Sequence, residues 1–235
     1  MVGADERIAS SRPFTPELEL RTLFVLNEQG RIVSNREPAR TPGPRFFLIR
    51  GRSRCAWAVH ATVPDHLAAR LEALASEEPP AADFRSEPAH AAQYMSIVGG
   101  RPQRSPAFTF PETLASPVGI ATIDHLSQLE RNLRGWTAED IPGCSPIVGV
   151  LESGAAISAC FCARQSPFAA EAGVETAPAF RGRGLAPRVT AAWALAIRAS
   201  GRLPIYSTSW DNEASLAVAR KLELRACASH WSLSD

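Results

Sequence analysis

The stretch "VETAPAFRGRGLAP", residues 174–187, decides the fold of this chain. A strand-like run ends at Pro178, a turn rich in arginine and glycine follows, and an apolar-periodic helix begins at residue 185. At the start of a helix, unpaired backbone N–H groups and the positive end of the helix dipole point at the same place, which suits a phosphate group. The sequence therefore predicts a phosphate-binding turn between a strand and a helix.

Glycines and arginines dominate this turn. Gly182 and Gly184 remove Cβ atoms where the chain must curl, while Arg181 and Arg183 add charge-assisted donors that can reach a pyrophosphate. An ATP- or GTP-binding loop ends in Gly-Lys-Ser/Thr, but this turn contains no lysine. A dinucleotide fingerprint needs a third glycine at residue 187, which is proline. The spacing favours a pyrophosphate site of another kind, with an ordinary tight turn as the simpler alternative.

The elements around the turn alternate between helix and strand. Apolar periodicity predicts a helix, a hairpin, a strand, a helix, a strand, a helix and a strand over residues 123–136, 145–164, 171–176, 185–200, 202–210, 212–224 and 226–233. Leu126, Leu129 and Leu133 share one face of the first helix, and Gly201 ends the helix after the turn. This order predicts an α/β fold with a mixed sheet.

The first half of the chain contains more proline. Proline-rich segments occupy residues 36–45, 76–90 and 101–111; between them the sequence predicts short hairpins over 22–35 and 45–59 and a helix over 62–78. Thr62 is the expected N-cap of that helix. A boundary in the second or third proline-rich segment divides the chain into an extension, residues 1–100, and a domain, residues 101–235.

Composition disfavours several functional classes. Of 235 residues, 45% are hydrophobic and 21% are charged, as in an ordinary globular protein. A formal net charge of +1 gives no whole-molecule field for nucleic acid or anionic lipid, so neither is expected as a partner. Glu152 interrupts the most apolar stretch, and Asp5 and Glu6 stand where a secretory signal carries positive charge, so we expect neither a membrane span nor export.

Cysteine usage bears on the compartment and on metal binding. The five cysteines are an odd number in a chain too large to need disulfides, which indicates reduced thiols in the cytoplasm. Cys160 and Cys162 would share one face of a strand, but no second Cys/His pair with ligand spacing accompanies them. We therefore expect buried apolar thiols and no metal.

In this context the turn resembles a known signature. "RGRGLA", residues 181–186, matches the Arg/Gln-x-x-Gly-x-Gly/Ala motif of the GNAT acetyltransferase superfamily at Arg181, Gly184 and Ala186. Pro178 and Phe180 precede it, as the proline–aromatic approach that is usual in that family. The motif is short, so its context matters.

The context is similar to that family as well. GNAT proteins follow the motif with a long helix, a strand, an Asn-x-x-Ser/Ala element and a final strand, and here Asn212 and Ser215 stand at the matching place. The resemblance covers roughly residues 110–235. It implies a mixed, mostly antiparallel sheet flanked by helices, here with an N-terminal hairpin and helix extension.

The resemblance also implies a mode of binding coenzyme A. The strand before the turn would pair with the pantetheine arm, the turn's amides would hold the pyrophosphate, and Asn212 would reach the arm from across the cleft. The implied binding residues are Val174, Glu175, Thr176, Arg181, Gly182, Arg183, Gly184, Leu185, Ala186, Asn212 and Ser215. Asn212 can also be the N-cap of its own helix, and both roles can hold together.

Acyl transfer to an amine needs a base for the ammonium proton. The family sometimes uses a carboxylate on the strand before the turn, which makes Glu175 the first choice and Glu171 the second. Four residues apart, they share a face of a regular strand, and a bulge would separate them. Each can instead be a solvated strand residue, and His125 and His230 are weaker candidates.

The acid that protonates the leaving thiolate is where the sequence departs from the family pattern. A tyrosine often stands seven residues after the asparagine, but this position is Ala219. Tyr206 is a catalytic substitute or a packing residue, and Ser207, Ser209 or a water are further alternatives.

The function implied by the resemblance is N-acetyl transfer from acetyl-CoA to a primary amine of a small molecule, an amino acid or a peptide. Two alternatives stay open: a non-catalytic acyl-CoA-binding or sensing protein, motivated by Ala219, and an acyltransferase that uses a longer acyl-CoA. Assembly as a homodimer is a further alternative that the sequence leaves open. Residues 1–100 are placed to cover the acceptor side of the cleft.

Overall fold

The computed structural model describes residues 13–234, so Asp5 and Glu6 lie outside the described part. Its helices are α1 (Pro16–Leu23), α2 (Asp65–Ser76), α3 (Ala91–Val98), α4 (Asp140–Cys144), α5 (Leu185–Ala199) and α6 (Glu213–Lys221), with 3₁₀ turns at Leu126–Gln128 and Pro178–Phe180. Its strands are β1 (Phe24–Leu26), β2 (Ile32–Asn35), β3 (Phe46–Gly51), β4 (Cys55–Val59), β5 (Arg101–Thr109), β6 (Ala121–Thr122), β7 (Val148–Glu152), β8 (Ala155–Gln165), β9 (Ala169–Thr176), β10 (Leu203–Ser207) and β11 (Arg225–Ser234).

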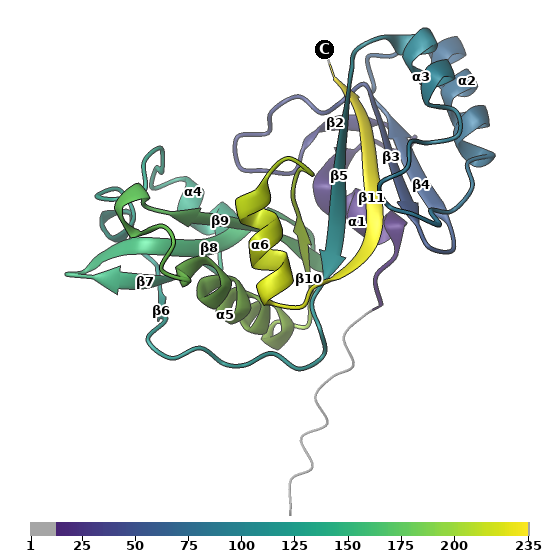
Figure 1. Ribbon diagram of the computed structural model, residues 1–235. Helices are drawn as coiled ribbons and strands as arrows, with labels where there is room; N and C mark the ends of the chain where they lie inside the picture. The colour runs from purple at the N-terminus through teal and green to yellow at the C-terminus, as the bar shows by residue number, and fades with distance from the viewer. Residues whose placement is uncertain (1–12, 235) are drawn as a thin grey trace, which may run out of the picture.

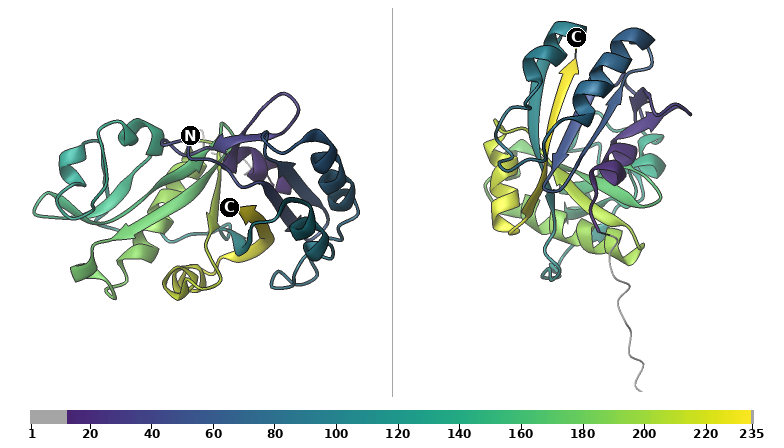
Figure 2. Two further views of the ribbon diagram at one scale, coloured as in Figure 1. Left: turned by 90° about the horizontal axis from the view of Figure 1, so that it is seen from above. Right: turned by 90° about the vertical axis from the view of Figure 1, so that its right-hand side faces the viewer.

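Nine of these strands form one sheet in the order β4-β3-β11-β5-β10-β9-β8-β7-β6, and β1 and β2 form a separate pair. Within the large sheet only β10 and β9 pair in parallel. Figures 1 and 2 show the purple-to-blue first half at one end of this sheet and the green part at the other, with yellow β11 between them. The prediction of a mixed, mostly antiparallel sheet flanked by helices is confirmed.

The third proline-rich segment is a strand near the middle of this sheet. β5 pairs with β11 from Arg101 to Thr109, but with β10 only over its last three residues. The carbonyl of Pro106 accepts from Thr208 N, so the backbone of Pro106 faces away from β11. Pro102 lies four residues earlier on the same strand and so faces the same way. Both prolines therefore occupy positions where β11 does not need a backbone N–H donor from β5.

Two faces of β9 pack against different helices. Ala170 and Ala172 belong to the core formed with Val189 and Trp193 of α5. Ala169, on the other face, packs with Leu18 of α1. Since side chains alternate along a strand, Glu171 and Glu175 share the α1 face. The N-terminal helix therefore packs on the Ala169 end of the face that carries both candidate carboxylates, whereas Trp136 lies against Glu175 at the other end.

Two local predictions are wrong. Residues 123–136 form the 3₁₀ turn Leu126–Gln128 and further turns, because Asn132 Nδ2 bonds the Ala156 carbonyl at 3.2 Å and Leu133 is buried in a separate cluster. These contacts hold the segment against β8 in a non-helical course. Thr62 does not cap α2: the N-cap is Pro64, and the Thr62 hydroxyl pairs with His60 Nδ1 at 2.8 Å.

The end of α5 and the burial of two cysteines agree with the sequence predictions, whereas two short helices were not predicted. Gly201, with φ of 74°, follows α5 as its terminator. Cys160 and Cys162 are fully buried free thiols against α5. The short helices α1 and α3 are additions to the predicted elements, α1 being capped by Thr15, which accepts from Leu18 N at 3.2 Å. Among residues 13–234, no helix has both the length and the apolar character of a membrane span.

Candidate active site

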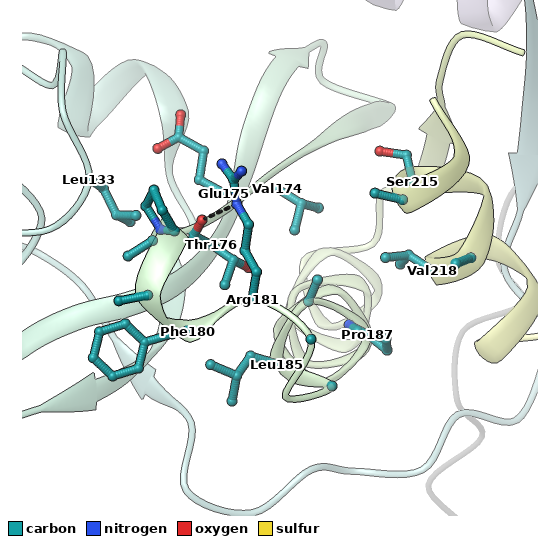
Figure 3. Close-up of a pocket in the computed structure, with 18 of the residues that line it drawn as sticks. Leu133, Val174, Glu175, Thr176, Phe180, Arg181, Leu185, Pro187, Ser215 and Val218 are labelled. Carbon is teal, nitrogen blue, oxygen red and sulfur yellow. Dashed lines mark hydrogen bonds between the residues drawn. The ribbon is translucent and has the colours of Figure 1, made fainter. Parts of the chain in front are cut away.

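The parallel pairing of β10 with β9 stops part-way along β9. It runs from Leu203↔Ala169 to Ile205↔Glu171, whereas β9 continues to Thr176 with β8 along its other edge. Among the described strands, none pairs with the last part of β9 on the β10 side. A cleft of about 1120 Å³ lies there, between β9 and α6 (Figure 3).

Four parts of the chain line this cleft. They are residues 131–134, residues 174–187 apart from Arg183, Tyr206 of β10, and residues of the 212–221 segment that contains α6. Most of the residues named from the sequence are thus brought together. Arg183 and Glu171 are not among the lining residues.

The glycine turn forms the end of the cleft where α5 begins. Gly182 and Gly184 have φ of 78° and 71°, which L side chains rarely adopt, and a Cβ at either position would meet no atom within 4 Å. No side chain caps α5, whose N-cap is Gly184 itself. The first amides of the helix therefore face open space, as an anion-binding helix start requires.

The two arginines of the turn have different surroundings. Arg181 lines the cleft and donates Nε–H to the Thr176 carbonyl at 3.3 Å (Figure 3). Arg183 donates to the Ala179 carbonyl at 3.2 Å and lies over the Phe180 ring. Arg181 thus points its remaining donors along the cleft, whereas Arg183 braces the turn from outside.

The opposite wall is the start of α6. Asn212 is the helix N-cap, its Oδ1 accepting from Ser215 N at 3.0 Å, and both residues line the cleft. Tyr206 also lines it, but its side chain is buried and its hydroxyl donates to the Ser215 carbonyl at 3.3 Å. Burial raises the pKa of Tyr206. Ala219 is buried in the core, so no polar group occupies the position where the family often has tyrosine.

The two glutamates of β9 are in contrasting environments. Glu171 is 4% exposed, its Oε2 accepts from Arg164 Nη1 at 3.0 Å, and its Oε1 accepts from the Ser207 hydroxyl. Glu175 lines the cleft, and its Oε2 accepts from Trp136 Nε1 at 3.2 Å. Both oxygens of Glu171 are therefore engaged in the sheet, while Glu175 presents a carboxylate to the cleft.

Three cleft features were not found from the sequence. Arg131 and Arg134 line the cleft from the turn that ends at Trp136, and Lys221 lines it from the end of α6. Lys221 is the only lysine of the chain. No local sequence pattern marks these residues, because they line the cleft only through the way the 131–136 turn and α6 pack against the rest of the fold.

The weaker histidine candidates lie elsewhere. His230 is buried on β11, 2.9 Å from Oε1 of buried Glu19, and its Nδ1 lies 3.2 Å from the Ser105 hydroxyl. Burial alone would lower the pKa of His230, but the Glu19 carboxylate outweighs this and raises it. His125 is exposed, and neither histidine lines the cleft. The described residues contain no group of three or more His, Cys, Asp or Glu that could hold a metal ion.

Comparison with known proteins bears on this geometry. Residues 148–226, from β7 to the start of β11, match the model of the GNAT acetyltransferase family. This part of the chain resembles the GNAT family. The resemblance predicted from the sequence is thereby confirmed for the GNAT segment, the name used below for residues 148–226.

Solved structures of GNAT proteins are also similar to this chain. A GNAT-family protein from Novosphingobium aromaticivorans is 22% identical over 57% of this chain and 64% of its own, with a TM-score of 0.47. A GNAT-family acetyltransferase from Colwellia psychrerythraea is 14% identical over 77% and 78%, with a TM-score of 0.46. A tandem GNAT protein from the clavulanic acid biosynthesis pathway is 13% identical over 77% and 75%, with a TM-score of 0.45. The chain thus spans less than two thirds of the first of these, and no curated protein matches it.

Proposed function

We propose that this protein transfers an acetyl group from acetyl-CoA to a primary amine. The observation that carries the proposal is the cleft in the GNAT segment, where the open edge of β9, an uncapped helix start and the Glu175 carboxylate meet. Acetyl-CoA would supply a thioester carbon and a thiolate leaving group. The open space at Gly182 and Gly184 supports the fit of its phosphates.

The residues of the cleft divide the binding work. The amides of residues 182–186 and the guanidinium of Arg181 would hold phosphate oxygens. The open edge of Val174–Thr176 would pair with an extended arm as another strand would. Asn212 uses Oδ1 as a cap, which leaves its Nδ2 to donate across the cleft. Ser215 and Leu185 complete the walls.

Glu175 is placed to act as the base. An acceptor amine is protonated at neutral pH and must lose a proton before its nitrogen attacks the thioester carbon. That first proton passes to the Glu175 carboxylate and from there to solvent. As the N–C bond then forms and the C–S bond breaks, the nitrogen gives up a second proton, which Glu175 takes in turn, so that the product is a neutral amide. Trp136 holds one carboxylate oxygen and leaves the other for this proton. The thiolate takes its proton from solvent, because the Tyr206 hydroxyl is bonded to Ser215 O.

The buried Ala219 favours a second candidate function, an acyl-CoA-binding protein without turnover. A purified sample incubated with acetyl-CoA and a panel of amines tests both. Thiol release with at least one amine, accompanied by acetylated amine in the mass spectrum, supports the transferase. CoA binding without thiol release from any amine supports the second function, and release only from longer acyl-CoA donors supports a longer acyl chain. We also propose a cytoplasmic location, since all five cysteines are free.

A further inference from the structure

Two arginines line the same cleft as Glu175 and have no partner among the described residues. Arg131 and Arg134 line the cleft, both are exposed, and neither makes a hydrogen bond or ion pair with another described residue. Arginines near the turn differ: Arg181, Arg183 and Arg188 each donate to a backbone carbonyl. Arg131 and Arg134 therefore have all their donors available to a ligand.

The backbone between the two arginines is fixed. Asn132 Nδ2 donates to the Ala156 carbonyl at 3.2 Å, and Leu133 is 4% exposed. Two residues later, Trp136 packs edge-on against Phe161 at 4.7 Å and donates to Glu175. The same turn thus positions both arginines and the proposed base, so a ligand held by the arginines lies near that base.

The arginines lie away from the phosphate end of the cleft. Figure 3 shows Leu133 beside the Glu175–Thr176 end of β9, on the opposite side from α6. The phosphate end already has the uncapped start of α5, and Lys221 lines the α6 wall. A second ligand, rather than CoA alone, is the better match for Arg131 and Arg134.

Charge in the cleft decides the kind of acceptor. Among the described residues that line it, four are cations (Arg131, Arg134, Arg181 and Lys221) and Glu175 alone is an anion. A polycationic acceptor would be repelled there, whereas an anionic group beside the amine would meet two planar guanidinium forks. We infer that the acceptor is a primary amine that also carries a carboxylate or a phosphate group, held by Arg131 and Arg134.

This inference rests on the proposed function and names its acceptor class. The test compares kcat and KM, at saturating acetyl-CoA, for amino acids against their decarboxylated amines, and for O-phosphoethanolamine against ethanolamine. We expect the anionic member of a pair to have a KM about tenfold or more lower. The carboxylate and phosphate pairs show which anion is preferred.

The double variant Arg131→Ala/Arg134→Ala should lose this preference, through a higher KM for the anionic amine, while keeping its CoA affinity. Arg220→Ala is the control, because Arg220 is exposed, pairs with Glu213 and does not line the cleft. Equal or better use of neutral amines by the unaltered protein overturns the inference. So does a double variant that binds CoA more weakly and lowers turnover of both amines alike, which would assign the arginines to the CoA site.

A binding measurement separates this inference from the proposed function. The same anionic amines are titrated calorimetrically into the protein saturated with CoA, where no turnover occurs. Binding that the double variant loses supports the inference even if no amine is acetylated. Absence of binding by every anionic amine at millimolar concentration overturns it, even if neutral amines are turned over.

Discussion

Trp136 donates its indole N–H to Oε2 of Glu175 across 3.2 Å, and its ring packs edge-on against Phe161. This bond joins the turn that follows the 3₁₀ segment to the open edge of β9. It fixes the direction of the carboxylate that we propose as the base. The turn is thus part of the site, although it lies outside the GNAT segment.

Trp136→Phe should lower kcat without weakening CoA binding. The phenyl ring keeps the packing on Phe161 but cannot donate to Glu175, so the carboxylate loses its orientation. A hydrogen bond to a charged group contributes about 1.5–3 kcal/mol, which corresponds to about tenfold or more in rate. Trp210→Phe is the control, because Trp210 packs under Arg85 and does not line the cleft. Unchanged kcat in Trp136→Phe would remove the positioning role.

Glu175→Gln and Glu171→Gln should affect different properties. In Glu175→Gln the proton acceptor is lost, so kcat should fall by ~10²–10⁴. The acidic limb of the pH–rate profile should disappear as well. In Glu171→Gln the guanidinium of Arg164 loses its carboxylate, and the free energy of unfolding should fall by about 1.5–3 kcal/mol. Each variant is the control for the other. A loss of turnover confined to Glu171→Gln would transfer the base to Glu171.

Gly184→Glu should abolish CoA binding in a folded protein. The substitution places a side chain and a negative charge in front of the α5 amides, where we propose that the pyrophosphate binds. Gly154→Glu is a matched control: Gly154 has φ of 79° and open space around it, but it lies in the β7–β8 turn outside the cleft. Both variants carry the same backbone strain, so calorimetry with CoA isolates the effect of position. Equal CoA affinity in the two variants would refute the phosphate site.

Stability should depend on pH through His230. Its folded pKa is raised above the ordinary value of 6.5, because the Glu19 carboxylate outweighs the opposing effect of burial. A raised folded pKa gives stabilisation that is full below about pH 6.5 and is lost as pH rises through the folded pKa. We expect the difference in unfolding free energy between the unaltered protein and His230→Gln to shrink with rising pH in urea titrations.

His66→Gln is the control for that measurement, since His66 is exposed on α2. This variant removes a histidine without touching the His230–Glu19 contact. A His230→Gln difference that grows with rising pH would show that burial, not Glu19, controls this histidine.

Residues 1–100 should not fold independently of residues 101–235. β11 lies between β3 and β5, and Trp231 of β11 packs with Tyr94 and Phe46 from the first half. Separating the halves would expose this core. We expect neither fragment to give a cooperative thermal transition and fragment 101–235 to lose turnover. A cooperative transition in fragment 1–100, with full turnover in fragment 101–235, would establish the boundary at residue 100 as a domain division.

The sequence by itself determined the glycine turn and the elements next to it. Gly182 and Gly184 adopt the left-handed conformation that glycine tolerates best, and α5 follows directly from its own apolar periodicity. Asn212 caps α6 through a bond to Ser215 three residues away. These features depend on neighbouring residues in the chain, so a local pattern carries the information.

Tertiary structure alone decided the rest of the site. Trp136 and Glu175 are 39 residues apart and meet because the 131–136 turn is held against β8. Glu171 and Glu175 have the same residue type on one strand, yet contacts with Arg164 and Ser207 bury the first and leave the second in the cleft. The proline-rich β5 became a strand because Pro102 and Pro106 face away from β11 and lie before the three residues that pair with β10. In each case the deciding partner lies far away in sequence, and no local periodicity records it.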